Sequence, residues 1–221
     1  MAIVSRSDQT RLAMLRAAER LFAEKGVDAV SLREIASAAG QGNHSAALYH
    51  FGDKRQLLEA VLHRHSGPID DALARDVPAL VSRGEADLST LVELLVAPLV
   101  AKLDDADGGP AYLQICAELV NNRSFPITDL SAANGPGSAA LRVALLRAAG
   151  DTPMALLPLR MLRTAAVLFC SIAAYQRLVD AGLDVPRDLF RRDLVTSVEA
   201  LLRSAPAAKG TPRAAKKSCS R

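Results

Sequence analysis

Residues 31–57 read SLREIASAAGQGNHSAALYHFGDKRQL, and this stretch decides the fold of the first part of the chain. Ser31 stands three residues before Glu34, which is the spacing of a capping box. In a capping box both side chains bond amide groups that are left free where a helix begins. Apolar residues then recur at helical spacing as far as Gly40, a residue type that often ends a helix in the left-handed conformation. These signals predict a short helix between the serine and the glycine.

The rest of the stretch predicts a second short helix and the start of a third. The second helix ends near Phe51, and Asp53 with Gln56 forms another capping-box pair that opens the third. The outer face of the second helix is small and polar and consists of Ser45, Ala46, Tyr49 and His50. A short helix with such a face, supported by a preceding helix, is the helix-turn-helix arrangement that enters the major groove of DNA. The stretch therefore predicts a DNA-binding domain.

The composition predicts an all-α protein. Half of the 221 residues are hydrophobic (50%), only 4% are aromatic and tryptophan is absent, so Leu, Ala and Val must fill the core. Leu and Ala favour helices, and the alternating polar and apolar runs that are typical of strands are hard to find. Further helices are predicted at about 8–25, 53–65, 69–82, 87–103, 111–122, 139–149, 154–181 and 187–204.

Two changes of composition divide the chain into domains. Ser66-Gly67-Pro68 is a strong helix breaker, so we expect the third helix to stop at His65. This gives an amino-terminal three-helix domain over residues 1–66 and a helical carboxy-terminal domain over residues 67–204. Residues 205–221 are rich in Pro, Ala and Lys, which predicts a disordered basic tail.

The net charge of +3 is unevenly distributed. Residues 1–66 carry nine Lys/Arg and seven Asp/Glu, residues 67–202 carry twelve and seventeen, and residues 203–221 carry six and none. A slightly basic head on an acidic body suits a protein whose head touches phosphates. A surplus of two charges over the first segment is nevertheless close to chance, so the helix pattern carries the prediction of DNA binding.

Other classes of function find little support in the sequence. No GxSxG, P-loop, dinucleotide fingerprint or HExxH motif occurs, so we expect no enzymatic activity and no cofactor. The three cysteines lie far apart, and we expect the four histidines at the surface or on phosphates rather than on a metal. The first residues lack the apolar core of a signal peptide, and the longest apolar run, residues 165–174, is shorter than the roughly 20 residues of a membrane span. We therefore expect a cytoplasmic protein with no membrane partner.

The last two predicted helices indicate self-association. Residues 165–174 are apolar almost all round, so a helix there needs cover on every side. The final helix adds an apolar stripe of Leu189, Phe190, Leu194, Val195, Val198, Leu201 and Leu202. Two such wide faces favour a homodimer, with ordinary core packing within one chain as the alternative. A dimer also suits DNA binding, because twofold-related helices recognise half-sites roughly 34–36 Å apart.

Five short segments form a set within residues 8–66. They are Leu21-Phe22-Ala23-Glu24-Lys25-Gly26, Ser31-Leu32-Arg33-Glu34-Ile35-Ala36, Ala39-Gly40, Leu48-Tyr49-His50-Phe51, and Lys54 followed by Leu57-Leu58. As a set they resemble the TetR (tetracycline-repressor) family of transcriptional regulators. The resemblance implies a ligand-responsive, homodimeric repressor that binds a near-palindromic operator in double-stranded DNA. It also implies that a small-molecule effector enters the carboxy-terminal domain and shifts the helix that starts at Asp53, which moves the recognition helices out of register.

The resemblance assigns DNA contacts to Tyr49, His50 and Lys54. Contacts of Tyr49 and Lys54 to phosphates would fix the register of the protein without reading bases. The alternatives are packing of Tyr49 against the first helix and a solvated role for Lys54. One departure concerns the turn, where Gly40 and Tyr49 are nine positions apart and most relatives have seven. The longer turn either changes the entry angle of the recognition helix or adds Asn43 and His44 as groove contacts.

Further candidates come from residue chemistry. Ser31 can hold a phosphate at the start of its helix, while Arg33 either reaches the edge of the groove or is a plain surface residue. Ser45 and Ala46 are small enough to approach a thymine methyl group. Asn43 can pair with adenine, although Asn before a helix is more often its cap.

The effector site is nearly invisible in the sequence. The candidates on helices that would line the carboxy-terminal domain are Tyr112, Cys116, Met161, Phe169 and Tyr175, each of which has an ordinary core position as its alternative. The rival function is that of a non-specific DNA-binding or helical adaptor protein without an effector. Such a protein would not prefer one near-palindromic site over random DNA.

Overall fold

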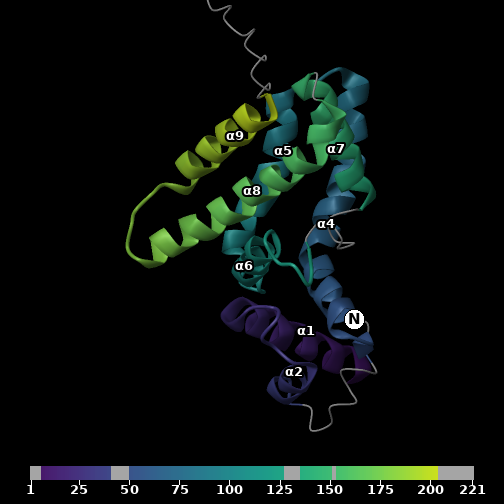
Figure 1. The fold of residues 1–221 in the computed structure, drawn as a ribbon, viewed down its shortest axis with the longest axis vertical. Helices are drawn as coiled ribbons and strands as arrows, with labels where there is room; N and C mark the ends of the chain where they lie inside the picture. Colours follow the sequence, from purple (N-terminus) through teal and green to yellow (C-terminus); the bar gives the residue numbers. More distant parts are fainter. Residues whose placement is uncertain (1–5, 41–49, 127–134, 151–152, 204–221) are drawn as a thin grey trace, which may run out of the picture.

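The computed structural model describes residues 6–40, 50–126, 135–150 and 153–203, and every regular element in these ranges is helical (Figure 1). The α-helices are α1 (Arg6–Lys25), α2 (Leu32–Ala38), α4 (Lys54–Arg83), α5 (Leu88–Ala101), α6 (Gly109–Leu119), α7 (Pro136–Ala149), α8 (Leu157–Asp180) and α9 (Arg187–Arg203). Two short 3₁₀ turns, Lys102–Asp104 and Met154–Leu156, follow α5 and precede α8. The predicted all-α class is confirmed.

Helices α1 and α2 form the lower part of the molecule in Figure 1, and their boundaries follow the local signals. The Ser31 hydroxyl accepts a hydrogen bond of 3.2 Å from the Glu34 amide. The Glu34 carboxylate lies 2.6 Å from Lys25 Nζ, and the Lys25 ammonium together with the Ser31 amide lowers the pKa of Glu34. Gly40 has a φ of 72°, the left-handed conformation that favours glycine. The predicted capping box and glycine turn are confirmed.

The predicted stop of the third helix at residues 66–68 is wrong, because α4 continues unbroken to Arg83. A proline inside a helix removes one hydrogen bond and crowds the preceding turn, at a cost of about 3 kcal/mol. Pro68 is accommodated because the helix around it is held by tertiary contacts, with His65, Gly67 and Leu73 all buried. Helix α4 thus links the lower part to the upper part, and the domain boundary after residue 66 remains a prediction.

Helix α7 lies directly against α4, and a buried carboxylate fixes the contact. Asp70 of α4 accepts hydrogen bonds from the Gly137 amide (3.1 Å), the Ser138 amide (2.6 Å) and the Ser138 hydroxyl (2.7 Å). Gly137 approaches so closely that a Cβ atom there would lie 2.0 Å from the Asp70 carbonyl oxygen. Asp70 therefore caps the start of α7 from a neighbouring helix.

The remaining helices build the upper part, where α8 and α9 form an antiparallel pair (Figure 1). Tyr175 of α8 stacks on Phe190 of α9 at 4.2 Å between ring centroids, and its hydroxyl donates to the Val185 carbonyl at 2.8 Å. At the other end of the pair, the buried Arg160 donates to the Leu202 carbonyl at 2.8 Å. Buried residues from α1 through α9 belong to one continuous hydrophobic core.

The Asp70 cap predicts a specific acid sensitivity. Burial raises the pKa of Asp70, but the hydrogen bonds from Ser138 and Gly137 outweigh it, so the net pKa is lowered. A lowered carboxyl pKa adds stability above the unfolded value of about 3.9, and this stability is lost as the pH falls through the folded value. Asp70→Asn should therefore reduce the free energy of unfolding at pH 7. It should also make the free energy of unfolding less dependent on pH in the acidic range, which urea unfolding at several pH values measures.

Asp71→Asn changes the exposed neighbouring carboxyl and is the matched control for Asp70→Asn. The control should keep the acid dependence of the wild-type protein. Equal pH profiles for the two variants would contradict the role assigned to Asp70.

Candidate nucleic-acid interface and ligand cavity

Four of the predicted DNA-contacting residues lie in the described part of the chain. Ser31 and Arg33 are exposed at the start of α2, while His50 and Lys54 are partly buried near the start of α4. Lys54 Nζ donates to the Asp28 carbonyl at 3.0 Å. One of its three ammonium hydrogens is thus engaged in holding the turn between α1 and α2, and the others remain for an external anion. The other predicted contacts, Asn43, His44, Ser45, Ala46 and Tyr49, lie outside the described residues.

A buried ionic junction joins this lower part to the body, and no local pattern along the chain predicts it. Glu19 of α1 is 3% exposed, and its carboxylate pairs with two consecutive side chains of α4, Arg64 and His65. Glu19 Oε1 lies 2.5 Å from His65 Nε2. His65 is 2% exposed, so the expectation that it lies at the surface or on a phosphate is wrong.

The loop before α6 completes this junction. Arg64 Nη1 lies 2.8 Å from Asp107 Oδ2, and Arg16 Nε of α1 lies 2.9 Å from Asp107 Oδ1. Arg16 and Arg64 lower the pKa of Asp107, which keeps this carboxyl charged. The adjacent Gly108 has a φ of 94°, and a Cβ atom there would lie 2.0 Å from a carboxylate oxygen of Glu19. We call Arg16, Glu19, Arg64, His65 and Asp107 the α1–α4 junction.

One aromatic ring lies between the α1–α4 junction and a cavity that is partly open to solvent. The His65 ring stacks on Tyr112 of α6 at 4.9 Å between centroids, with 25° between the ring planes. Tyr112 and Ser66 both line a cavity of about 280 Å³ between α4, α5, α6, α7 and α8. A molecule bound in the cavity would therefore touch a side chain that contacts the junction directly.

The structure brings three of the five predicted pocket residues together. Tyr112, Met161 and Phe169 line the cavity. Cys116 is buried one helical turn from Tyr112, and burial raises the pKa of its thiol to about 12, so it is a neutral core residue. Tyr175 packs at the α8–α9 contact instead. Sequence periodicity marks all five as inward-facing, but it does not tell a cavity wall from a packed core.

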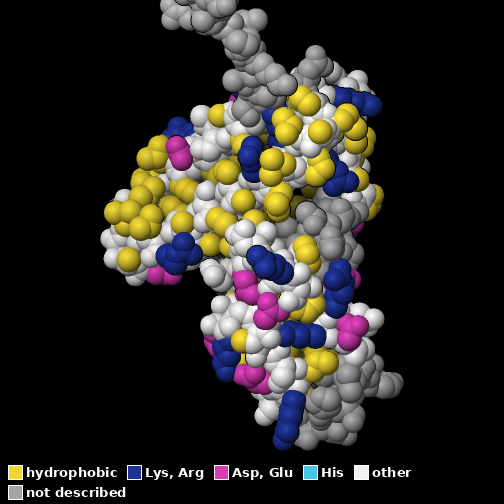
Figure 2. All heavy atoms as spheres, viewed as in Figure 1, with side chains coloured by type: hydrophobic (Ala, Val, Ile, Leu, Met, Phe, Trp, Pro, Cys, Tyr) yellow, Lys and Arg dark blue, Asp and Glu magenta, His cyan; other side chains and the backbone are white. Residues whose placement is uncertain are grey.

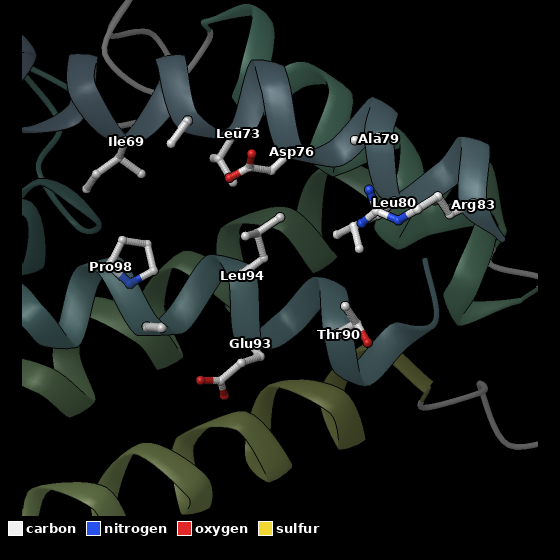
Figure 3. A pocket seen from close by; sticks show the side chains of 12 residues that line it. Ile69, Leu73, Asp76, Ala79, Leu80, Arg83, Thr90, Glu93, Leu94 and Pro98 are labelled. Atoms are coloured by element: carbon white, nitrogen blue, oxygen red, sulfur yellow. The ribbon is translucent and has the colours of Figure 1, made fainter. Parts of the chain in front are cut away.

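A groove on the outside of the molecule adjoins this cavity. It lies between α4 and α5, has a volume of about 540 Å³ and shares the side chains of Ile69 and Leu73 with the cavity wall. Figure 3 shows Leu80 and Arg83 of α4 facing Thr90 and Leu94 of α5 along it. Two apolar side chains are thus common to the walls of both hollows.

Comparison with known proteins finds a family that resembles the lower part of the molecule. Residues 14–61 match the model of the family described as "Bacterial regulatory proteins, tetR family". This segment is thus similar to regulatory proteins of the TetR family. This match covers the later part of α1, all of α2 and the start of α4, and it includes both capping boxes.

Two curated relatives match part of this chain. The HTH-type transcriptional repressor Rv3405c of Mycobacterium tuberculosis is 40% identical over 72 residues, which cover 33% of this chain and 38% of the relative. The HTH-type transcriptional repressor BepR of Brucella suis is 37% identical over 65 residues, which cover 29% and 31%. The similarity thus spans less than two fifths of either relative.

Solved structures extend the likeness to the whole fold. A TetR family transcription regulator from Marinobacter aquaeolei VT8 has a TM-score of 0.61 at 22% identity, with 89% of this chain and 96% of that chain covered. A HlyIIR mutant protein has a TM-score of 0.53 at 17% identity, with 92% and 100% covered. At such identities the likeness shows the fold alone.

The burial of Glu19 predicts a large effect of a small substitution. Glu19→Gln keeps the shape of the side chain but removes the buried charge that faces Arg64 and His65, while Arg64 keeps its ion pair with Asp107. Because a buried hydrogen bond to a charged group is weakened, the free energy of unfolding should fall by about 1–3 kcal/mol. Urea unfolding at pH 7 measures the difference. Glu24→Gln on the same helix is the control, because Glu24 pairs with Arg20 at 3.6 Å with both side chains more than half exposed. Such surface pairs contribute about 0–1 kcal/mol, so equal effects of the two substitutions would show that the junction does not hold α1 in place.

Proposed function

We propose that this protein is a DNA-binding transcriptional regulator that acts as a ligand-responsive, homodimeric repressor. The single observation that carries the proposal is the cavity beside the α1–α4 junction, placed directly behind a TetR-type DNA-binding domain. Two relatives that share this domain are named transcriptional repressors. We place the protein in the cytoplasm, where it has access to DNA.

The geometry of the lower part supports DNA binding. Helix α2 is capped at its start by Ser31 and packs on α1, so it forms a rigid support for the segment that follows it. Arg33 is exposed on α2, and the helix start offers backbone amides to a phosphate. Lys54 stands at the opening of α4, which follows the same segment in the sequence. Groups that can fix the register on phosphates thus precede and follow the proposed recognition segment along the chain.

The path of α4 supports ligand response. The helix opens at the Asp53 cap beside the recognition segment and passes the junction at Arg64 and His65. It then lines the cavity from Ser66 onward. A ligand that displaces Tyr112 or Ser66 would therefore change how α4 is held against α1. The ligand would release the protein from DNA only if its affinity for this changed arrangement of α4 is higher than its affinity for the DNA-bound arrangement.

The outer side of α8 supports a homodimer. Figure 2 shows hydrophobic side chains gathered over α8 and α9, and Leu159, Leu178, Leu183 and Leu189 are each between 42% and 52% exposed. By length and composition alone the Met154–Asp180 stretch could also cross a membrane, and 22% of its apolar window is buried. The hydrogen bond from Arg160 to α9 and the cavity wall on the inner side tie α8 to the body. We therefore infer that the cover of its outer side is a second copy of the chain.

The homodimer is tested by mass in solution. Light scattering after gel filtration should give about twice the 23.4 kDa of one chain. Leu178→Glu should shift the protein towards one chain, because it places a charge in an apolar contact. Val143→Glu alters a 48% exposed apolar residue on α7 and should leave the mass unchanged. A single-chain mass for the wild-type protein would exclude the dimer, and recovery with membranes would favour the membrane-spanning alternative.

DNA recognition is tested on an operator selected from a random duplex library. Fluorescence anisotropy should show a preference of about 10³ or more for the selected site over random DNA. Lys54→Ala should weaken binding to every sequence and lower the salt slope by about one, since it removes one phosphate contact. Arg83→Ala, at the far end of α4, should leave the slope unchanged. Equal binding to all sequences would favour the non-specific or adaptor function.

A further inference from the structure

The chemistry of the cavity wall restricts what can bind there, given that the proposed effector site is correct. Most of the wall is hydrocarbon from Leu, Ile, Ala, Met and Phe side chains. Its hydroxyl groups are largely engaged within the protein. The Ser138 hydroxyl donates to Asp70 at 2.7 Å, the Thr164 hydroxyl donates to the Arg160 carbonyl at 2.9 Å, and the Tyr112 hydroxyl bonds the Cys116 thiol. These groups do not require a polar ligand.

Arg142 differs from the rest of the wall. It lies on α7 one turn after Ser138, and it is the one charged residue among the described residues that line the cavity. It forms no ion pair with any described carboxylate. The nearby Asp70 carboxylate is engaged by the amides and hydroxyl at the start of α7. A guanidinium that has no counter-charge among the described residues and stands beside an apolar cavity favours an anionic group, and its planar fork matches a carboxylate.

The cavity also limits the size of the ligand. Its volume of about 280 Å³ lies at the lower end of the range for small-molecule sites. At about 30 Å³ for each water-sized group, it holds about nine such groups. This matches a carboxylate with a short hydrocarbon chain.

We propose that the effector is a compact, mainly apolar carboxylic acid whose carboxylate pairs with Arg142. Its hydrocarbon part lies against the inner side of α8, around Leu168 and Phe169. The chain end then reaches towards Tyr112, which stacks on His65 of the α1–α4 junction. The ligand thus connects α7 with the ring that contacts the junction.

The test measures direct binding without DNA, using octanoate, octan-1-ol and octylamine as probes of equal chain length. Isothermal titration calorimetry should show octanoate binding at least about tenfold more tightly than octanol, with octylamine the weakest, since a charge-assisted pair is stronger than a neutral hydrogen bond. Arg142→Gln should weaken octanoate by about tenfold or more and leave octanol within about twofold. Arg147→Gln is the matched control, because Arg147 lies on the same helix but lines a different groove.

A second variant locates the hydrocarbon part. Ala165→Phe fills the cavity and should weaken octanoate and octanol together, whereas it leaves the charge at Arg142 in place. Circular dichroism and retained binding of the selected operator show that each variant is folded.

Three results would overturn the proposal: equal affinities for octanoate and octanol, no effect of Arg142→Gln, or no binding of any probe. None of these bears on DNA binding, which is measured separately. A protein that prefers its operator but ignores octanoate remains a regulator with a different effector. One that binds octanoate through Arg142 but prefers no DNA sequence keeps the acid site and loses the proposed function.

Discussion

The carboxylate of Glu19 is the constraint on which the arrangement of the two parts depends. A charge that is almost fully buried must be matched by partners in close contact, because removal from water costs several kcal/mol per ion. Arg64 and His65 supply those partners from α4, and Asp107 anchors Arg64 and Arg16 from the loop before α6. The orientation of α1 relative to the body is therefore set by a small group of charges rather than by apolar packing alone.

The same constraint explains why α4 must be a single helix. Its first turns support the DNA-binding domain, its middle turns carry the junction, and its later turns line the cavity and hold α7 through Asp70. A break in the helix at Pro68 would allow the turns that line the cavity to move independently of the turns that carry the junction. Buried contacts on both sides of the proline keep the helix intact, so a change at the cavity can reach the DNA-binding end along one rigid element.

Helix α8 has two apolar regions that face different surroundings. Its inner side, with Met161, Leu168 and Phe169, lines the cavity. Its outer side, with Leu159 and Leu178, is exposed. A ligand and a second copy of the chain would thus occupy opposite sides of one helix. In the proposed complex the positive charge that pairs with the ligand comes from Arg142 of α7.

Local signals along the chain are enough to predict most of the helices, their caps and the similarity of residues 14–61 to the TetR family. These depend on signals within a few residues, such as Ser31 with Glu34, which the backbone satisfies locally. Even there, local signals predicted a stop at Pro68 that tertiary packing overrides. Only the tertiary structure decided that Glu19 meets His65, 46 positions along the chain, and that Tyr112, Met161 and Phe169 share a cavity while Cys116 and Tyr175 do not. Contacts between distant residues depend on how whole helices pack, and no local pattern records that packing.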